Sequence, residues 1–318
     1  MPVLNPTSIA IIGAGAVGGY YGARLAEAGH DVTFLMRRDY NAVKSNGLMI
    51  NSPDDDLYIS KPQIVTHSKD IGPVDWVICA LKATTIDAVF ELLSPCVHES
   101  TNILVLMNGL GLEEFFASLF KEQEIFGGLA FTCINRGEPG IINHLDYGPI
   151  TIGHFGNDED LLKHATNLWQ TSKVEVASSP SLLQARWEKL CWNIPFNGIS
   201  VVEGGITTDL ILSNPGLTEA AGSLMDEVIA IGNADLKAHE ESGRIDNYQM
   251  KNRMFDLTKT MGAYQPSTMI DFIHGREMEI DAIFSEPIRR ASQLGVQAPH
   301  ISSLRSSMQG LQIDAERS

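Results

Sequence analysis

Near its start the chain carries Ser8-Ile-Ala-Ile-Ile-Gly-Ala-Gly-Ala-Val-Gly-Gly19, a short apolar segment that runs directly into a glycine-rich turn. Its glycines stand at G-x-G-x-x-G spacing, which predicts the turn of a dinucleotide-binding βαβ unit. In such a turn the first glycine permits the bend, the second lets the backbone approach a pyrophosphate, and the third lets helix and strand pack closely. The residues of this predicted cofactor site are Gly13, Ala14, Gly15, Ala16, Val17 and Gly18.

The flanking segments support the motif, because a glycine-rich turn alone is common and can be purely structural. Residues 20–28 are typical of a helix, Gly29 is placed to end it, and residues 31–36 are typical of the next strand. The complete strand–turn–helix–strand unit is therefore present, and it favours a bound dinucleotide over a structural turn.

The end of the second expected strand indicates which dinucleotide binds. Sites selective for NAD usually place an acidic residue there, where it binds the ribose 2′-hydroxyl. This chain has Arg37 and Arg38 instead, and guanidinium groups suit a 2′-phosphate. We therefore predict NADP(H) as the cofactor. The alternative is that both arginines are solvated surface residues.

The first half of the chain alternates apolar strands with helices, which predicts a mostly parallel sheet covered on both faces. After the first βαβ unit we expect strands over 75–80, 102–107, 125–130, 140–144, 149–153 and 172–177, with a helix over 84–93. The fold class is α/β: an N-terminal Rossmann-type doubly wound sheet followed by a C-terminal all-helical domain.

The pattern of apolar residues changes near residue 178, and beyond it only helical periodicity is convincing. We predict an NADP-binding Rossmann domain over 1–178 and a helical domain for substrate and dimerisation over 179–318. The expected helices cover 182–192, 217–240, 247–259, 268–274 and 281–294. Ligands of open α/β folds bind beyond the carboxyl ends of the strands, so we expect the active cleft between the two domains.

Composition excludes several classes of partner. The 318 residues carry a net charge of −16, which argues against binding to nucleic acid or to an anionic membrane. No apolar stretch is long enough to span a bilayer, and no signal peptide precedes the first strand, so we expect a cytoplasmic protein. Four scattered cysteines and nine histidines form no ligand pattern, which predicts neither a disulfide framework nor a metal site.

Two strand ends carry polar residues that could contact a ligand. Lys82 follows the strand at 75–80, where it could reach a cofactor phosphate or a substrate carboxylate, or could be an exposed loop lysine. Asn108 follows the strand at 102–107 and could bind a ligand or the nicotinamide ribose. Asn-Gly is equally a turn signal, so position alone leaves both alternatives open.

The first helix of the second domain carries the candidate proton donor. Lys189, Asn193 and Asn197 fall at i, i+4 and i+8, so they share one helix face among apolar neighbours. A partly desolvated lysine could donate a proton to the oxygen of a keto acid as negative charge develops there. The alternative is a polar stripe on a solvated helix face.

In this order and spacing, the motifs resemble those of the ketopantoate reductase (2-dehydropantoate 2-reductase) family over essentially the full length. The matching elements are the Gly13–Gly18 turn, Leu81-Lys82, Asn108-Gly-Leu-Gly, Pro139-Gly…Gly148…Ile152-Gly153, Lys189-Leu-x-x-Asn193-x-x-x-Asn197 and Ser267…Glu279-Ile-Asp281. The resemblance implies NADPH-dependent reduction of 2-dehydropantoate to pantoate, on the route to pantothenate and coenzyme A.

The resemblance also implies a role for each matching residue. Lys189 would protonate the ketone oxygen, and Glu279 would act with it in catalysis and contact the cofactor. Substrate would be bound by Asn108, Asn193, Asn197 and Ser267. Cofactor contacts would also come from Arg37, Lys82, Asn108 and, through its backbone, the region of Cys133. Homodimerisation through the helical domain is compatible with the resemblance, and nothing in the composition bears on it.

One departure affects the choice of keto acid. Family members commonly carry a further asparagine ten residues beyond the Asn197 position, where this chain has Thr207-Thr208-Asp209. A paralogue that reduces another 2-keto or 3-keto acid is therefore the nearest alternative. A non-catalytic NADP-binding sensor is the rival from another class, but it would not need Lys189 and Glu279 together.

Overall fold

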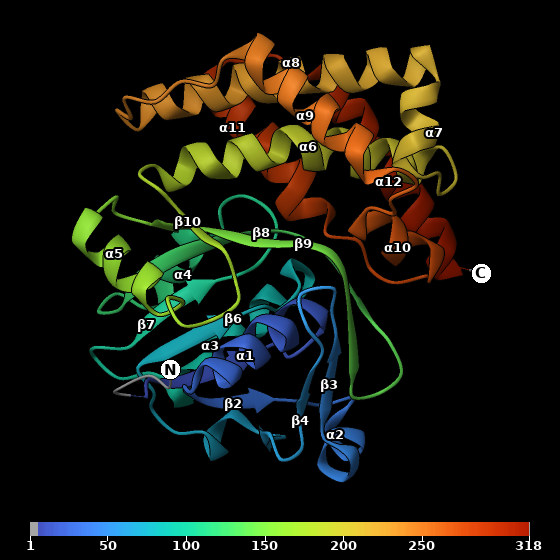
Figure 1. Cartoon of the computed structure of the whole chain (residues 1–318). Helices are drawn as coiled ribbons and strands as arrows, with labels where there is room; N and C mark the ends of the chain where they lie inside the picture. Colours follow the sequence, from blue (N-terminus) through green and yellow to red (C-terminus); the bar gives the residue numbers. More distant parts are fainter. Residues whose placement is uncertain (1–5, 318) are drawn as a thin grey trace. The chain divides into compact units, whose positions relative to one another are not determined.

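The computed structural model describes residues 6–317, and their side chains as far as residue 313. It separates into two compact units (Figure 1): residues 1–107 with 112–182, and residues 108–111 with 183–318. The division thus falls after residue 182, and the short loop at 108–111 belongs with the helical unit. Among the described residues, no helix combines the length and apolarity needed to cross a bilayer.

The first unit is built on one sheet of ten strands. The strands are β1 (Ser8–Ile12), β2 (Asp31–Leu35), β3 (Leu48–Asn51), β4 (Leu57–Ile59), β5 (Gln63–Val65), β6 (Trp76–Cys79), β7 (Asn102–Val105), β8 (Glu124–Arg136), β9 (Ile141–His154) and β10 (Val176–Ser179). Their order is β4-β3-β9-β8-β7-β6-β1-β2-β5, with β10 paired to β9. All pairs are parallel except β8 with β9 and β3 with β4, which confirms the mostly parallel sheet.

The doubly wound topology confirms the predicted Rossmann-type fold. From β1 the chain passes to β2 on one side, and later returns to β6 and β7 on the other side. The strand order therefore reverses between β1 and β6, which is where such sheets bind their ligands. The glycine turn leaves β1 at this point.

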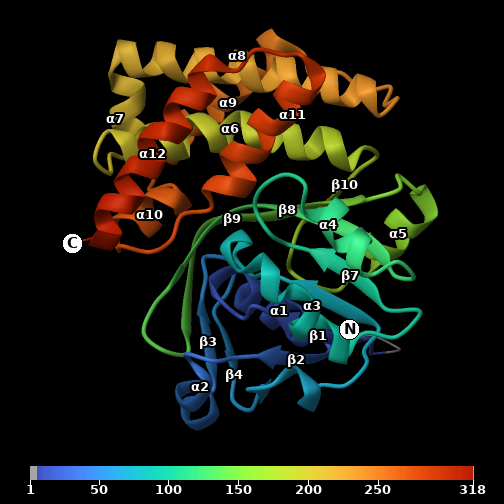
Figure 2. The same cartoon turned by 180° about the vertical axis from the view of Figure 1, so that it is seen from behind.

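Helices cover both faces of the sheet. They are α1 (Ala16–Ala28), α2 (Tyr40–Asn46), α3 (Val89–Leu93), α4 (Leu112–Leu119) and α5 (Glu159–Asn167). Helix α1 lies in front of the strands in Figure 1, whereas α3 and α4 come to the front when the unit is turned (Figure 2). Gly29 ends α1 in the left-handed conformation, at φ 103°, as the sequence predicts.

Three features of this unit differ from the expectations. The strands expected over 125–130, 140–144 and 149–153 form the two long strands β8 and β9, which pair antiparallel. A register shift between Tyr147 and Ile150 accommodates Pro149 within β9. Strands β3, β4 and β5 were not predicted; β4 and β5 end the strand order, and β3 lies between β4 and β9. The helix expected over 84–93 begins as a 3₁₀ helix at Ala83–Ala88.

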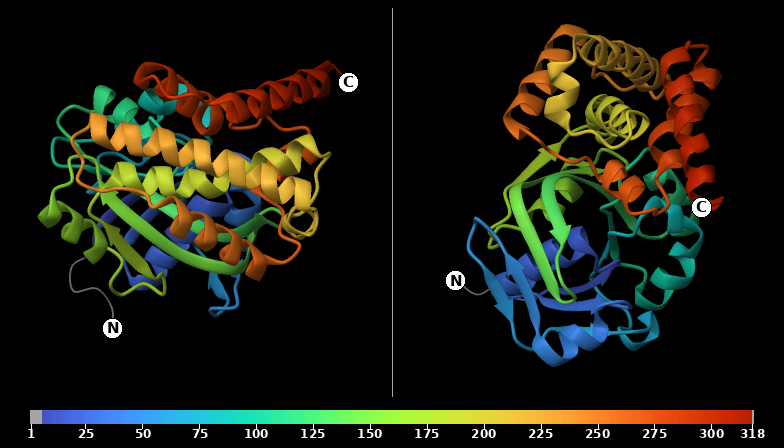
Figure 3. Two further views of the ribbon diagram at one scale, coloured as in Figure 1. Left: turned by 90° about the horizontal axis from the view of Figure 1, so that it is seen from above. Right: turned by 90° about the vertical axis from the view of Figure 1, so that its right-hand side faces the viewer.

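The second unit contains only helices among its described residues, as predicted. They are α6 (Leu182–Val202), α7 (Thr208–Ser213), α8 (Pro215–Ala238), α9 (Asn247–Met261), α10 (Ser267–Ile273), a π-helix (Asp281–Ser285), α11 (Glu286–Leu294) and α12 (Pro299–Arg317). The long helices α6 and α8 run side by side (Figure 3), and they are antiparallel because Trp187 near the start of α6 binds Asp235 near the end of α8.

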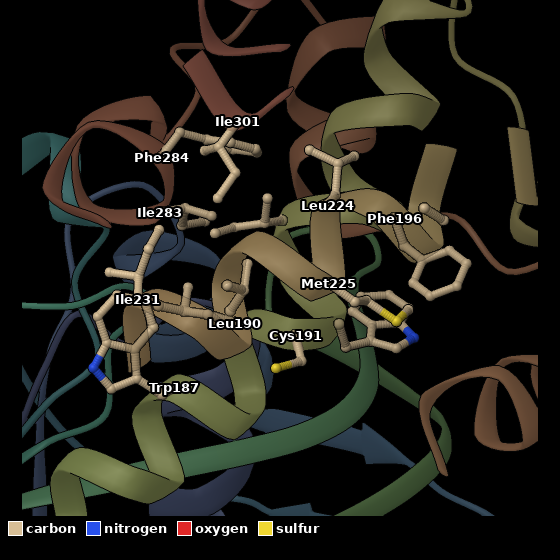
Figure 4. Close-up of a cluster of buried hydrophobic side chains, with 14 of the residues drawn as sticks. Trp187, Leu190, Cys191, Phe196, Leu224, Met225, Ile231, Ile283, Phe284 and Ile301 are labelled. Atoms are coloured by element: carbon tan, nitrogen blue, oxygen red, sulfur yellow. The ribbon is translucent and has the colours of Figure 1, made fainter. Parts of the chain in front are cut away.

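Helix α6 is longer than expected because burial outweighs a helix-breaking residue. We expected it to end at residue 192, but it continues to Val202 through Pro195. Proline removes a backbone hydrogen bond inside a helix. The residues beyond it, including Phe196 and Ile199, are buried in the apolar core that Figure 4 shows around α6 and α8. Helices α7 and α12 were not predicted.

Candidate active site

Two glycines of the turn are required by close packing within the first unit. Gly13 has φ +93°, and a Cβ there would lie 2.6 Å from the carbonyl carbon of Ala80 at the end of β6. A Cβ on Gly18 would lie 2.4 Å from the carbonyl oxygen of Gly13. Neither position can carry a side chain without moving backbone, so the turn and the approach of α1 to β1 depend on both glycines.

Gly15, the second glycine of the motif, is not crowded by protein at the start of α1. A Cβ on Gly15 would find no protein atom nearer than the Gly13 oxygen at 3.9 Å. Gly15 is the N-cap residue of α1, and the first turn of this helix holds no acidic residue. Free backbone N–H groups and the positive end of the helix dipole favour an anion there. The cradle around Ala14, Ala16 and Val17 therefore fits the pyrophosphate of a dinucleotide.

Basic side chains lie around this cradle. Arg37 and Arg38 are exposed just beyond β2, and Arg38 Nε lies 4.0 Å from Asp39 Oδ1. Arg136, at the end of β8, donates to the carbonyl oxygen of Ala14 at 3.4 Å and lies 3.6 Å from Asp39 Oδ2. Sequence reasoning missed Arg136 because β8 was expected to end at residue 130. A correct length for β8 would have placed a basic residue at its end.

The other cofactor candidates of this unit lie in separate segments. Lys82 is exposed and caps the 3₁₀ helix that follows β6, and its carbonyl oxygen accepts from Thr85 N at 3.0 Å. Cys133 is half-buried on β8, opposite Asp146 and beside a register irregularity. Cys79, by contrast, is fully buried, and burial raises the pKa of its thiol to about 12, as expected of a packing residue.

The second unit buries the polar face of α6. Lys189, Asn193 and Asn197 are only 7%, 7% and 1% exposed, so the stripe is not a solvated surface. Lys189 Nζ donates a 2.8 Å hydrogen bond to Oδ1 of Asn108, in the loop that belongs to this unit. The structure thus joins two candidates that are 81 residues apart.

Asn197 has a structural partner that the sequence did not indicate. Its Nδ2 donates to the Asn193 carbonyl at 2.9 Å, and its Oδ1 accepts from Thr268 N at 3.0 Å. The amide therefore ties α6 to the first turn of α10, whose first residue is the exposed Ser267. This contact holds the predicted substrate-binding serine against the helix of the predicted proton donor.

Glu279 and the Asn108 loop are connected through one segment. Glu279 is 7% exposed and lies two residues before the π-helix at Asp281–Ser285. The N–H of Leu110 donates to the carbonyl of Ala282 in that π-helix at 2.9 Å. A Cβ on Gly109 would lie 2.4 Å from Ala282 Cβ, so only glycine allows this contact. We expected a single helix over 281–294, but a π-helix stands where the loop docks.

The position that departs from the family pattern is also structural. Thr208 is buried, and its hydroxyl donates to the carbonyl of Gly262 at 2.8 Å. Thr207 caps α7 and its hydroxyl donates to Asp209. The segment thus anchors α7 to the residues that lead into α10.

The second unit therefore holds all six candidates for substrate and proton transfer: Asn108, Lys189, Asn193, Asn197, Ser267 and Glu279. The first unit holds the glycine turn with Arg37, Lys82 and Cys133. A Rossmann-type unit and a helical unit with a buried lysine together define an oxidoreductase class that uses a nicotinamide dinucleotide.

Within that class, the chain belongs to the family described as ketopantoate reductase PanE/ApbA. The family model matches residues 9–157, and the C-terminal model of the same family matches residues 181–312. A curated 2-dehydropantoate 2-reductase from Nostoc sp. is 36% identical over 307 residues, covering 95% of this chain and 94% of that protein.

Solved structures share the fold along the whole chain. The 2-dehydropantoate 2-reductase from Geobacter metallireducens has a TM-score of 0.90 at 38% identity, covering 95% of this chain and 99% of that one. The 2-dehydropantoate 2-reductase from Methylococcus capsulatus has a TM-score of 0.87 at 28% identity, covering 98% of both chains. The family resemblance drawn from the motifs is confirmed.

Proposed function

We propose that this protein reduces 2-dehydropantoate to pantoate with NADPH, on the route to pantothenate and coenzyme A. The similarity to 2-dehydropantoate 2-reductases covers nearly the whole chain. The structural observation that carries the proposal is the buried Lys189, whose ammonium binds Asn108 in the same unit. A lysine on a solvated helix face would be neither buried nor hydrogen-bonded to Asn108.

Lys189 supplies the proton of the reaction. The nicotinamide, when bound, supplies hydride to the carbonyl carbon of the keto acid. Negative charge then develops on the carbonyl oxygen, and a buried ammonium neutralises it by proton transfer. The Asn108 amide oxygen accepts one of the ammonium protons at 2.8 Å and so orients the donor. Burial keeps competing water away from the ammonium.

The remaining candidates of the second unit bind and position the substrate. Asn193 lies one turn beyond Lys189, on the same buried face, and we assign it a substrate hydrogen bond. Asn197 and Ser267 act together, because the Asn197 amide holds the first turn of α10. Glu279 is assigned to orient the ammonium or to hold the substrate hydroxyl, and to contact the cofactor.

We further propose that the nicotinamide cofactor is NADP(H). Its pyrophosphate would lie on the N–H groups of the Gly13–Gly18 turn, which fits an anion. Arg37 and Lys82 would contact its phosphates, and the Cys133 backbone and Asn108 would make further contacts. Just beyond β2, where sites selective for NAD usually carry an acidic residue, this chain has Arg37 and Arg38, which supports NADP over NAD. The homodimer stays a prediction.

The test is NADPH oxidation with 2-dehydropantoate, compared between the wild type and Lys189→Ala. Loss of the proton donor is expected to lower kcat by about 10² to 10⁴. NADPH binding, followed by its fluorescence, should survive because Lys189 is not a phosphate ligand. Lys163→Ala is the matched control, since Lys163 is exposed and its ammonium forms a surface ion pair with its helix neighbour Asp160 at 3.0 Å.

Two results would count against the proposal in different ways. A Lys189→Ala enzyme as fast as the wild type would remove the proposed proton donor. A wild type that binds NADPH without reducing 2-dehydropantoate would instead point to another keto acid. The comparisons do not favour that alternative, and a panel of branched 2-keto and 3-keto acids tests it directly.

A further inference from the structure

We propose that a buried ion network in the helical unit, made of Asp235, Arg290 and Glu286, positions Lys189 against Asn108. The inference rests on the proposed function, because it concerns the residue assigned as proton donor. The network contains no atom assigned to substrate or cofactor. Its three members would act through the backbone and side chains that they hold in place.

One end of the network lies on the loop that carries Asn108. Gly111, the last residue of that loop, has φ +81°, and a Cβ there would be 3.1 Å from Oε1 of Glu286. The carboxylate of Glu286 therefore packs directly on the loop backbone. The same loop is bonded to the preceding π-helix through the N–H of Leu110. Two neighbouring contacts thus fix the loop to the segment 281–286.

The middle of the network is a chain of charges in which Arg290 and Asp235 are buried and Glu286 is half-buried. Oε1 of Glu286 accepts from Arg290 Nε at 2.8 Å, and Arg290 Nη1 donates to Asp235 Oδ2 at 2.8 Å. The side chains of Glu286, Arg290 and Asp235 are only 14%, 7% and 4% exposed. Buried ion pairs with hydrogen bonds hold a defined geometry, and loss of one partner leaves an uncompensated charge.

The other end of the network reaches the helix of the proton donor. Oδ2 of Asp235 also accepts from Trp187 Nε1 at 2.8 Å. Trp187 is fully buried and lies two residues before Lys189 on α6. A Cβ on Gly232 would lie 3.0 Å from the indole, so α8 packs closely on this side chain. Figure 4 shows Trp187 beside Ile231 and Leu190 in this core.

These contacts close a circuit around the Lys189–Asn108 hydrogen bond. It runs from Lys189 along α6 to Trp187, Asp235, Arg290, Glu286, the 108–111 loop and Asn108. Every step is a hydrogen bond, an ion pair, a packed backbone contact or a stretch of one helix. Since a displacement of about 1 Å can cost about 100-fold in rate, such a circuit can set the activity of the donor.

A double-mutant cycle separates positioning from simple stabilisation. We expect Asp235→Asn to lower kcat about tenfold, with KM within about twofold of the wild type. In an Asn108→Ala background the same substitution should change kcat less than about twofold, because the contact it positions is already gone. Asp226→Asn is the control, since Asp226 lies on the same helix in an exposed pair with Lys251 at 2.8 Å.

A second readout does not depend on catalysis. Hydrogen exchange of the peptide containing Leu110 should accelerate in Asp235→Asn and not in Asp226→Asn, because the loop loses its support. Should Asp235→Asn fail to fold, Trp187→Phe keeps the ion pairs and removes only the indole tether. The same pattern is then expected with a smaller loss of kcat.

Equal loss of kcat in both backgrounds, or unchanged exchange at Leu110, would overturn the positioning role. Failure of the proposed function would look different. In that case the wild type would not reduce 2-dehydropantoate, while the exchange experiment would still report whether the network holds the loop.

Discussion

Glycine is required at Gly13 and at Gly15 for two different physical reasons. Gly13 is held by protein atoms, since its φ is positive and a Cβ would meet Ala80 at 2.6 Å. Gly15 has space above it, and its lack of a side chain matters only to a ligand that approaches the turn. The motif contains both kinds of glycine, and the structure distinguishes them.

Alanine substitutions should therefore separate stability from cofactor binding. Gly15→Ala is expected to leave the free energy of unfolding, measured in urea, within about 0.5 kcal/mol of the wild type, as for substitutions that clash with nothing. It should nevertheless weaken NADPH binding. Gly13→Ala should lower both the free energy of unfolding and the affinity for NADPH. Calorimetric titration with NADPH and urea unfolding measure the two effects, and a Gly15→Ala protein with normal affinity would contradict the pyrophosphate site.

The arginines near the end of β2 make a second prediction at the residue scale. Arg37→Gln should weaken NADPH about tenfold or more, which is the size of a lost charge-assisted hydrogen bond, and should leave NADH unchanged. Arg38→Gln is the neighbouring control. Arg136→Gln should weaken both cofactors, because Arg136 lies on the turn at Ala14. Equal effects of Arg37→Gln on both cofactors would exclude a 2′-phosphate contact.

At the scale of elements, a polar side-chain contact joins the starts of two neighbouring strands, β1 and β6. Strand β1 begins at Ser8, whose N–H and hydroxyl donate to Asp75 Oδ2 at 2.9 and 2.7 Å. Asp75 directly precedes β6, so the carboxylate joins the starts of two neighbouring strands. The hydrogen bonds from the Ser8 hydroxyl and N–H hold the pKa of Asp75 below its usual range, against a smaller effect of burial.

This carboxylate should make part of the stability depend on pH. Because the pKa of Asp75 is lower in the folded protein, the unfolded chain binds its proton first as the pH falls. The contribution is therefore complete above the unfolded pKa of about 4 and is lost below it. The difference in the free energy of unfolding between the wild type and Asp75→Asn, measured in urea, should be constant near pH 6 and should shrink progressively as the pH falls below about 4. A constant difference between the two proteins would contradict the assignment.

At the scale of the whole molecule, a strongly acidic chain places three arginines where an anion is expected. The net charge is −16, yet Arg37, Arg38 and Arg136 lie near the glycine turn. An anionic cofactor would therefore be attracted locally in spite of the overall charge. Binding to the folded state alone should also stabilise the protein.

Cofactor binding should accordingly raise the thermal stability. At NADPH concentrations about 100 times Kd, linkage adds about 2.7 kcal/mol to the free energy of unfolding. The same concentration of NADH should add less if the 2′-phosphate is recognised. Scanning calorimetry with each cofactor measures this, and equal shifts in midpoint would argue against selectivity for NADP.

Much of the fold, and the choice of candidate site residues, followed from short sequence patterns. The G-x-G-x-x-G turn, the alternation of strands and helices, and the i, i+4, i+8 spacing of Lys189, Asn193 and Asn197 are local features, so they were legible without tertiary structure. They were sufficient for the Rossmann-type sheet, the helical second half and the family. Boundaries were less accurate where a local rule was overridden, as at Pro195 in α6 and Pro149 in β9.

The rest depended on contacts between residues far apart in the chain. No local pattern predicts that residues 108–111 pack with the helical unit, or that Asn108 binds Lys189. Arg136 reaches the glycine turn only because β8 runs its full length, and Asp235 reaches Arg290 across 55 residues. The sequence by itself determined which groups are available for chemistry. Tertiary structure alone decided which are buried together, because hydrogen-bond geometry and desolvation arise only when distant segments pack.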